Sequence, residues 1–130
     1  MNELEKVIKE MDFRYFGTGQ HNMDAETFLT NDNTVLLDIR TKEEVDTLKL
    51  PLSHFCPVIE IPVNEVPDRI EEIPKDKTIG VFCSAGVRAV IIFVYLRSKG
   101  FNNVKIIPGG YSGLIEAIKP GKLYKKLNKE

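Results

Sequence analysis

The apolar residues of this chain gather in short uninterrupted runs, and segments with helical spacing lie between them. Three runs have the β-branched and aliphatic composition of strands, at residues 34–40 (TVLLDIR), 78–83 (TIGVFC) and 103–107 (NVKII). A shorter run at 58–62 (VIEIP) indicates one more strand. The longest run lacks polar alternation, which is typical of parallel strands that helices cover on both faces.

Helical candidates fill the intervals between these runs. Residues 41–48 (TKEEVDTL) begin with Thr41 and Glu44 at the spacing of a capping box, and residues 86–99 form the longest candidate, ending at Gly100. Further candidates lie at 1–12, 25–30, 65–73 and 111–118. Strands that alternate with helices predict right-handed crossovers. We therefore expect an α/β three-layer domain with a central parallel sheet of about five strands.

Composition narrows the class of protein. The chain has 130 residues, 42% of them hydrophobic and 28% charged, with a net charge of -1, as in an ordinary single-domain globular protein. A near-neutral charge gives no reason to expect a nucleic-acid partner. No run approaches the length of a membrane span, and the charged N-terminus does not resemble a secretion signal, so we expect a cytoplasmic protein without a membrane partner. The oligomeric state stays open.

One cysteine stands where chemistry is expected. Cys83 ends an apolar run, and the small residues Ser84, Ala85 and Gly86 separate it from a long helical segment. Parallel sheets bind ligands beyond the carboxyl ends of their strands, and backbone N–H groups at a helix start favour an anion. Arg88 adds a cation that favours a thiolate at Cys83. The pattern predicts a nucleophilic cysteine, with a small apolar side chain at the end of a core strand as the alternative.

Three separated motifs carry a family resemblance. CSAGVR at 83–88, LLDIRTKEE at 36–44 and YLRSKGFNNVKIIPGGY at 95–111 resemble, in order and spacing, the rhodanese family of sulfurtransferases. The resemblance extends over about residues 22–118. It divides the chain into an N-terminal helix or arm (1–21), a rhodanese-like domain (22–120) and a basic C-terminal tail (121–130).

The resemblance also implies a reaction. Cys83 would take a sulfane sulfur from thiosulfate or from a persulfide on a protein or small thiol, and would pass it to a thiophilic acceptor. The loop that binds the persulfide would consist of Ser84, Ala85, Gly86, Val87 and Arg88. No metal or organic cofactor is implied. The partners would be a small anionic sulfur donor or a persulfide-bearing protein.

Two other functions compete with sulfur transfer. A non-catalytic rhodanese-like module, for interaction or for carrying a persulfide, is the first alternative. A phosphatase or arsenate reductase ranks lower, because the related loop of those enzymes places five residues between cysteine and arginine, whereas four separate Cys83 from Arg88. A smaller ring of amides suits one sulfur atom better than a tetrahedral oxyanion. Ser84 and Ala85 also stand where thiosulfate-using relatives often carry a basic residue.

Several neighbouring residues receive structural interpretations. The resemblance implies that Asp38 and Arg40 hold the end of the sheet to the next helix, and an ion pair of Arg40 with Glu43 or Glu44 is the simplest arrangement. Cys56 is expected to be a packed small side chain, with a resolving thiol for Cys83 as the alternative. His21 and His54 are isolated and have no metal-ligand spacing, so we expect no metal site.

Overall fold

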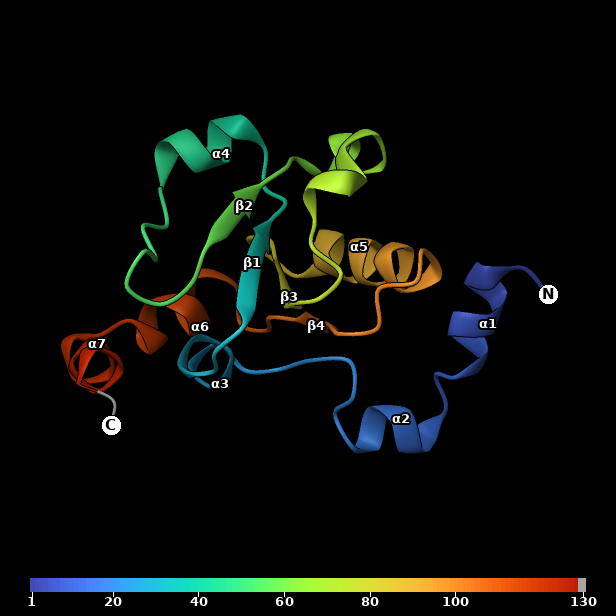
Figure 1. Cartoon of the computed structure of the whole chain (residues 1–130), viewed down its shortest axis with the longest axis horizontal. Coiled ribbons are helices and arrows are strands. Elements are labelled where there is room, and N and C mark those ends of the chain that lie inside the picture. Colours follow the sequence, from blue (N-terminus) through green and yellow to red (C-terminus); the bar gives the residue numbers. More distant parts are fainter. Residues whose placement is uncertain (129–130) are drawn as a thin grey trace.

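The computed structural model describes residues 1–128 and builds them around a four-stranded parallel sheet (Figure 1). The strands are β1 (Thr34–Asp38), β2 (Val58–Glu60), β3 (Thr78–Phe82) and β4 (Val104–Ile106). Their order in the sheet is β2-β1-β3-β4, and every neighbouring pair is parallel. This confirms the α/β prediction and places the carboxyl ends of all four strands at one edge.

The count of about five strands was slightly too high. Where a fifth strand would lie, the structure has one parallel bridge between Asn22 and Ile106. The N–H of Met23 donates to the Ile106 carbonyl, and the N–H of Ile106 donates to the His21 carbonyl. This segment therefore adds a single bridge beside β4 and does not form a fifth strand.

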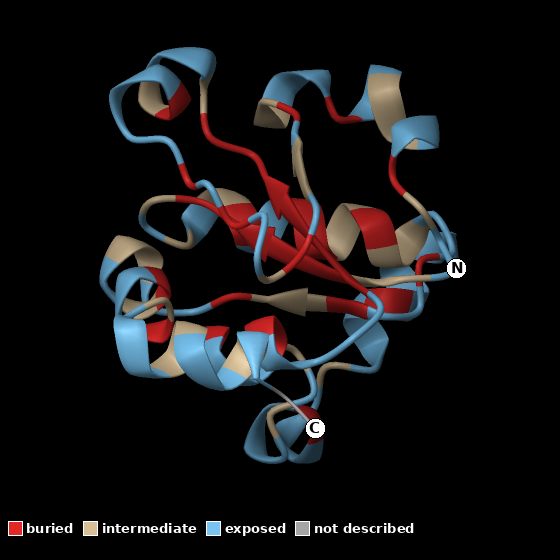
Figure 2. Cartoon of the chain, turned by 60° about the vertical axis from the view of Figure 1, so that its left-hand side comes forward, coloured by how far each residue is buried: buried red, intermediate tan, exposed pale blue. Residues whose placement is uncertain are grey.

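Seven α-helices and two 3-10 helices surround the sheet in residues 1–128. They are α1 (Glu3–Lys9), α2 (Phe13–Gly17), α3 (Ala25–Thr30), α4 (Lys42–Thr47), η1 (Val63–Glu65), η2 (Pro67–Glu72), α5 (Val87–Ser98), α6 (Gly110–Ala117) and α7 (Pro120–Leu127). The two central strands are the most continuously buried, β1 throughout and β3 in all but its first residue, whereas β2 and β4 are largely half-buried (Figure 2). The burial of β1 and β3 explains their apolar sequences.

The sheet separates two hydrophobic clusters. Leu37 packs with Phe93 of α5 on one face, whereas its neighbour Leu36 packs with Phe28 of α3 and Leu114 of α6 on the other. Successive residues of a strand point to opposite faces, so β1 serves both clusters. The domain is therefore three layers deep, as the sequence predicts.

Gly80 of β3 is required by this packing. A Cβ atom at that position would lie 2.6 Å from the ring of Phe28 and 2.9 Å from Ile107. Phe28 is fully buried. The absence of a side chain at Gly80 therefore leaves space for Phe28 of α3 to pack against the sheet.

The helix expected at 65–73 is instead η1 followed by η2. Pro67 stands at the start of η2, and Arg69 has a non-helical backbone (φ -124°, ψ 21°) that interrupts the segment. Proline removes a backbone donor, and the chain settles into tight 3-10 turns. The ion pairs of Arg69 with Glu65 and Glu72 lie on the surface of this segment.

Helices stand at both ends of the described residues 1–128. Pro120 does not end the helical region but opens α7, because proline is suited to the first helical position. Lys122 pairs with Glu26 at α3, and Lys126 lies 3.8 Å from Asp32. At the other end, α1 packs along α5. Within residues 1–128, no helix has both the length and the apolar character needed to cross a bilayer.

Candidate active site

Cys83 directly follows β3 at the carboxyl edge of the sheet, and its side chain is buried. Its Sγ accepts hydrogen bonds from the N–H of Gly86 at 2.9 Å and from the N–H of Ala89 at 3.4 Å. Both donors belong to the turn that opens α5. The sulfur thus lies where unpaired amides and the helix dipole favour negative charge.

Gly86 gives the loop its curvature. It is the N-cap residue of α5 with a left-handed backbone (φ 92°), a conformation that residues with a Cβ rarely adopt. Its side of the loop is open, since a Cβ there would meet nothing within 4 Å. The requirement for glycine is therefore one of backbone conformation rather than space.

Arg88, the last residue of the predicted loop, is not a free cation. Its Nη1 lies 2.7 Å from Oε1 of Glu44, and its Nη2 lies 3.0 Å from Oε2, so the pair is bidentate. Arg88 also donates to Oγ of Ser84 at 2.9 Å, and Ser84 donates to Glu44 at 3.2 Å. The loop is thereby joined to α4.

The charges of this pair stabilise each other. The hydrogen bonds from Arg88 hold the pKa of Glu44 well below its ordinary value, with a further contribution from the N–H of Thr41. In return, the hydrogen bonds to Glu44 raise the pKa of Arg88. Glu44 remains ionised through the neutral and mildly acidic range.

The segment PGGY approaches the loop from the other side. Gly110, the first residue of α6, lies so close to Ser84 that a Cβ would come within 2.4 Å of the Ser84 carbonyl oxygen. Both Gly109 and Gly110 have positive φ angles, 88° and 53°. The active-site loop is consequently held between α4 and the start of α6.

The chain matches a known protein family over most of its length. The family model described as Rhodanese-like domain matches residues 23–117. The chain belongs to this family.

Its relatives include complete small proteins and parts of larger ones. A protein named tRNA sulfurtransferase from Aeromonas hydrophila is 35% identical over 109 residues, which cover 79% of this chain and 22% of the relative. A protein named Sulfurtransferase from Allochromatium vinosum is 30% identical over 86 residues, covering 66% and 76%. The chain spans about a fifth of the length of the tRNA sulfurtransferases that it matches.

Solved structures show the same fold. The crystal structure of a rhodanese-related protein from Thermoplasma volcanium superposes with a TM-score of 0.62 at 24% identity, and covers 77% of this chain and 95% of that one. Identity at this level is informative about the fold alone.

Asp38 and Arg40 form a buried ion pair inside the rhodanese-like domain. Both side chains are fully buried, and Arg40 Nη2 lies 2.7 Å from Asp38 Oδ2. Arg40 also donates to the Leu48 carbonyl at 2.8 Å and to the Tyr111 hydroxyl at 3.2 Å. The expected ion pair of Arg40 with Glu43 or Glu44 was wrong, because Asp38 binds Arg40 and Arg88 binds Glu44.

Cys56 lies far from Cys83 in this domain. It packs in the cluster of Leu36 and Phe82, whereas Cys83 packs in the cluster on the opposite face of the sheet. Cys56 borders Thr34 at the start of β1, and Cys83 follows Phe82, which pairs with Asp38 at the end of β1. Four strand residues span roughly 13 Å. A disulfide needs Cα atoms within about 7 Å, so this fold does not permit one between the two thiols.

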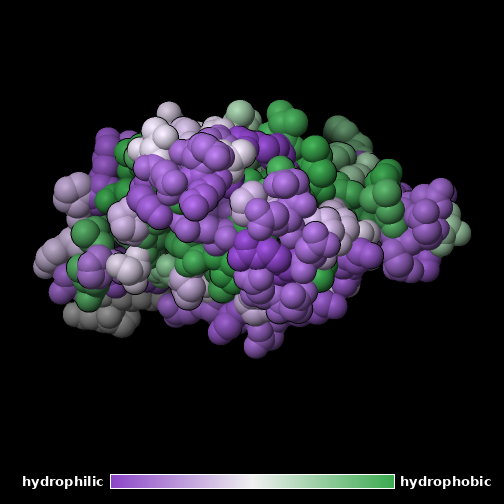
Figure 3. Space-filling view, turned by 90° about the horizontal axis from the view of Figure 1, so that it is seen from above, coloured by the Kyte–Doolittle hydropathy of each residue, from purple (hydrophilic) through white to green (hydrophobic). Residues whose placement is uncertain are grey.

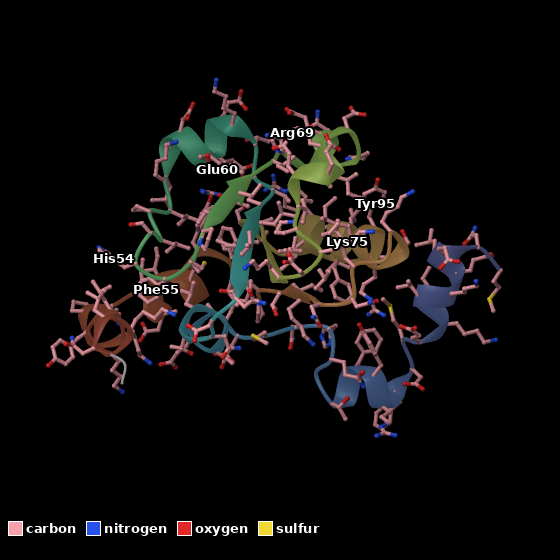
Figure 4. The ribbon with its side chains drawn as sticks, in the orientation of Figure 1. His54, Phe55, Glu60, Arg69, Lys75 and Tyr95 are labelled. Carbon is pink, nitrogen blue, oxygen red and sulfur yellow. The ribbon has the colours of Figure 1, made fainter. Side chains whose placement is uncertain are left out.

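Burial also makes Cys56 a poor nucleophile, because desolvation raises the pKa of its thiol. His54 and Phe55 lie on the loop before β2, on the side of α7 (Figure 4). His21 packs against the rings of Tyr15 and Phe16 instead. Across the described residues 1–128, no three His, Cys, Asp or Glu side chains are grouped so that they could hold a metal ion.

The predicted site residues form one continuous turn, but their side chains differ in placement. Those of Ala85 and Val87 are exposed, so these residues contribute backbone only. Sequence reasoning missed Glu44 and Gly110. The sequence indicates Glu44 only as a helix cap, which it also is, since Thr41 N–H donates to it at 2.9 Å.

Proposed function

We propose that this chain is a sulfurtransferase that carries a sulfane sulfur on Cys83 as a persulfide. The observation that carries the proposal is the pair of amides, from Gly86 and Ala89, at 2.9 and 3.4 Å from Sγ. Amides of the first helical turn have no partner within the helix, and those of Val87 and Arg88 remain for a second sulfur. The names of the two relatives agree with transfer of sulfur.

The reaction balances without an oxidant or a reductant. The Cys83 thiolate attacks the outer sulfur of the donor, and the bond between that sulfur and the rest of the donor breaks. The leaving group departs with the electron pair, as sulfite from thiosulfate or as a thiolate from an organic persulfide. An acceptor such as cyanide then attacks the outer sulfur of the enzyme persulfide and regenerates the thiolate.

A phosphatase or arsenate reductase fits this site less well. The loop closes on one sulfur atom, with α5 beginning only four residues after Cys83. A phosphate dianion would need Arg88 as its bidentate partner, but Glu44 holds that guanidinium at 2.7 and 3.0 Å.

A non-catalytic module is a weaker alternative, because a pure interaction domain has no need for amides aimed at a thiol. Carrying a persulfide between proteins is compatible with our proposal. We place the active unit at residues 22–120, flanked by 1–21 and 121–130, in a cytoplasmic protein that receives sulfur from a small donor or a persulfide-bearing protein. With a net charge of -1, the chain has no evident electrostatic attraction for tRNA.

The test is the intact mass of the protein after incubation with thiosulfate, or with a cysteine desulfurase and cysteine. We expect the wild type and Cys56→Ser to gain one sulfur atom, which cyanide releases as thiocyanate. Cys83→Ser should gain none. No adduct on the wild type with either donor would overturn the proposal, and turnover of an aryl phosphate that depends on Cys83 would favour the oxyanion enzyme.

A further inference from the structure

The mouth of the site contains a carboxylate that the reaction itself does not require. Glu44 reaches the active-site loop from α4, and its side chain is 29% exposed, as is that of Arg88. Glu44, Arg88 and Ser84 hydrogen-bond to one another in a closed triangle with edges of 2.7 to 3.2 Å. The guanidinium nearest the thiol is thus neutralised before any substrate arrives.

The carboxylate of Glu44 is also held by hydrogen bonds from Thr41, the N-cap residue of α4. Oε1 of Glu44 accepts from the N–H of Thr41 at 2.9 Å and from its hydroxyl at 3.0 Å. Thr41 in return accepts from the N–H of Glu44, which completes the capping box of α4. Since both oxygens are held, Glu44 cannot leave Arg88 without also losing the helix cap.

Apolar side chains border the Cys83 loop at the start of α5. Figure 3 views the molecule from the side of the strands' carboxyl ends, where the hydrophilic surface is interrupted by apolar side chains. Val87, Val90 and Ile91, at the start of α5, are 71%, 49% and 58% exposed. Their spacing puts them on one side of the helix, next to the Cys83 loop.

A cavity of about 320 Å³ adjoins the ion pair. It is lined by Glu43, Glu44, Thr47, Leu48 and Tyr111. Leu48 and Tyr111 provide apolar surface there, and the volume is within the range of small-ligand sites. The carbon skeleton of an organic donor would gain contacts in this cavity, whereas an inorganic anion would not.

We propose that Glu44 is a specificity-determining residue that turns the site away from sulfur oxyanions and toward persulfides of organic thiols, R–S–SH. The inference rests on the proposed function and adds the donor class to it. Thiosulfate carries two negative charges and meets a paired guanidinium with a fixed carboxylate beside it. The persulfide group carries at most one charge, and the adjoining cavity offers apolar surface to its carbon substituent.

Each donor leads to the same enzyme persulfide. With R–S–SH, the Cys83 thiolate attacks the outer sulfur, the S–S bond of the donor breaks, and R–S⁻ leaves with the electron pair. With thiosulfate, the leaving group is sulfite. The two reactions therefore differ at the mouth in the charge and shape of the leaving group, and the effect of Glu44 should appear in the choice between donors.

The decisive variant is Glu44→Gln, because glutamine retains an acceptor for the capping box while it removes the negative charge. Asp46→Asn is the matched control, since Asp46 is an exposed carboxylate on the same helix and does not line this cavity. Thiocyanate formation with cyanide as acceptor gives kcat/KM for thiosulfate and for hydroxyethyl persulfide generated in situ. A cysteine desulfurase with cysteine forms a third arm, which separates protein-borne from small persulfides.

We expect Glu44→Gln to raise kcat/KM for thiosulfate about tenfold, because removal of one charge beside a dianion is a large electrostatic change. Rates from hydroxyethyl persulfide should stay within about threefold, and Asp46→Asn should alter neither. The thiosulfate rate of Glu44→Gln should also fall more steeply with salt than that of the wild type, a response that a merely structural role would not produce.

The inference is overturned if Glu44→Gln changes both donors by the same factor, or if its thiosulfate rate stays the same or falls. Should that variant not fold, Ala85→Lys places an unpaired cation on the exposed loop and must shift the preference toward thiosulfate in the same way. Failure of the proposed function is a separate result, in which the wild type takes sulfur from none of the three donors.

Discussion

Gly110→Ala should lower both stability and activity, although Gly110 lies outside the loop that contains Cys83. The new Cβ would lie 2.4 Å from the carbonyl oxygen of Ser84, where ordinary contacts begin near 3.4 Å. Either α6 or the loop must therefore move by about 1 Å. Alanine with a φ of 53° adds about 1–2 kcal/mol of backbone strain, and crowding of this degree adds about 1–3 kcal/mol.

Gly109→Ala is the matched control. Its φ of 88° imposes a similar strain, but its Cβ would meet Gly113 at 3.2 Å rather than the loop. We expect Gly109→Ala to lower the free energy of unfolding by about 1–2 kcal/mol, and Gly110→Ala by about 2–5 kcal/mol.

Sulfur transfer should separate the two variants further than stability does. A displacement of about 1 Å in a catalytic loop can reduce the rate about a hundredfold, so Gly110→Ala should lose between tenfold and a hundredfold in kcat/KM with any donor. Gly109→Ala should retain most activity. Urea unfolding and thiocyanate formation on the same preparations provide the measurements. Equal losses of activity in both variants would show that contact between α6 and the Ser84 carbonyl does not position the loop.

Two further predictions concern the charged groups. Arg40→Met should lower the free energy of unfolding by about 3–5 kcal/mol, because it leaves Asp38 charged and fully buried; adding Asp38→Asn should recover part of that loss in urea unfolding, and no recovery would contradict the pairing. The pKa of Glu44 is lowered, so its stabilising contribution is present above its ordinary value of 4.5 and is lost progressively as the pH falls below that value. The difference in urea midpoint between wild type and Glu44→Gln should accordingly shrink from about pH 7 to about pH 3, and a constant difference would refute this account.

The sequence predicts best what depends on local order. The run 34–40 contains β1, and residues 78–98 form the expected strand, turn and helix. Burial on both sides gives strands continuous apolar runs, and small residues mark a close turn. The location of the thiol needed no tertiary information, because strand end and helix start adjoin in the chain.

The pairing of charges was beyond the sequence. The sequence favours Glu43 or Glu44 as the partner of Arg40, yet the buried partner is Asp38, two residues away. The true partner of Glu44 is Arg88, 44 residues later. Parallel crossovers bring such residues together only once the strands are in register.

Local propensity misled at two other places. Residues 65–73 have a helical composition, but Pro67 and the backbone of Arg69 divide them into 3-10 turns. The composition of residues 121–130 predicts only a basic tail, but Lys122 and Lys126 find acidic partners on and beside α3, and residues Pro120–Leu127 form α7. Both structures depend on the tertiary contacts of the segment, which its composition does not reveal.

The placement of Cys56 and Cys83 on opposite faces of the sheet bears on the lifetime of the persulfide that we propose on Cys83. In many thiol proteins a second cysteine nearby discharges the first as an internal disulfide. Here the chain has two cysteines, and the sheet stands between them. The persulfide that we propose on Cys83 has no second thiol within reach in the described residues, so its lifetime would be set by a nucleophile from outside this domain.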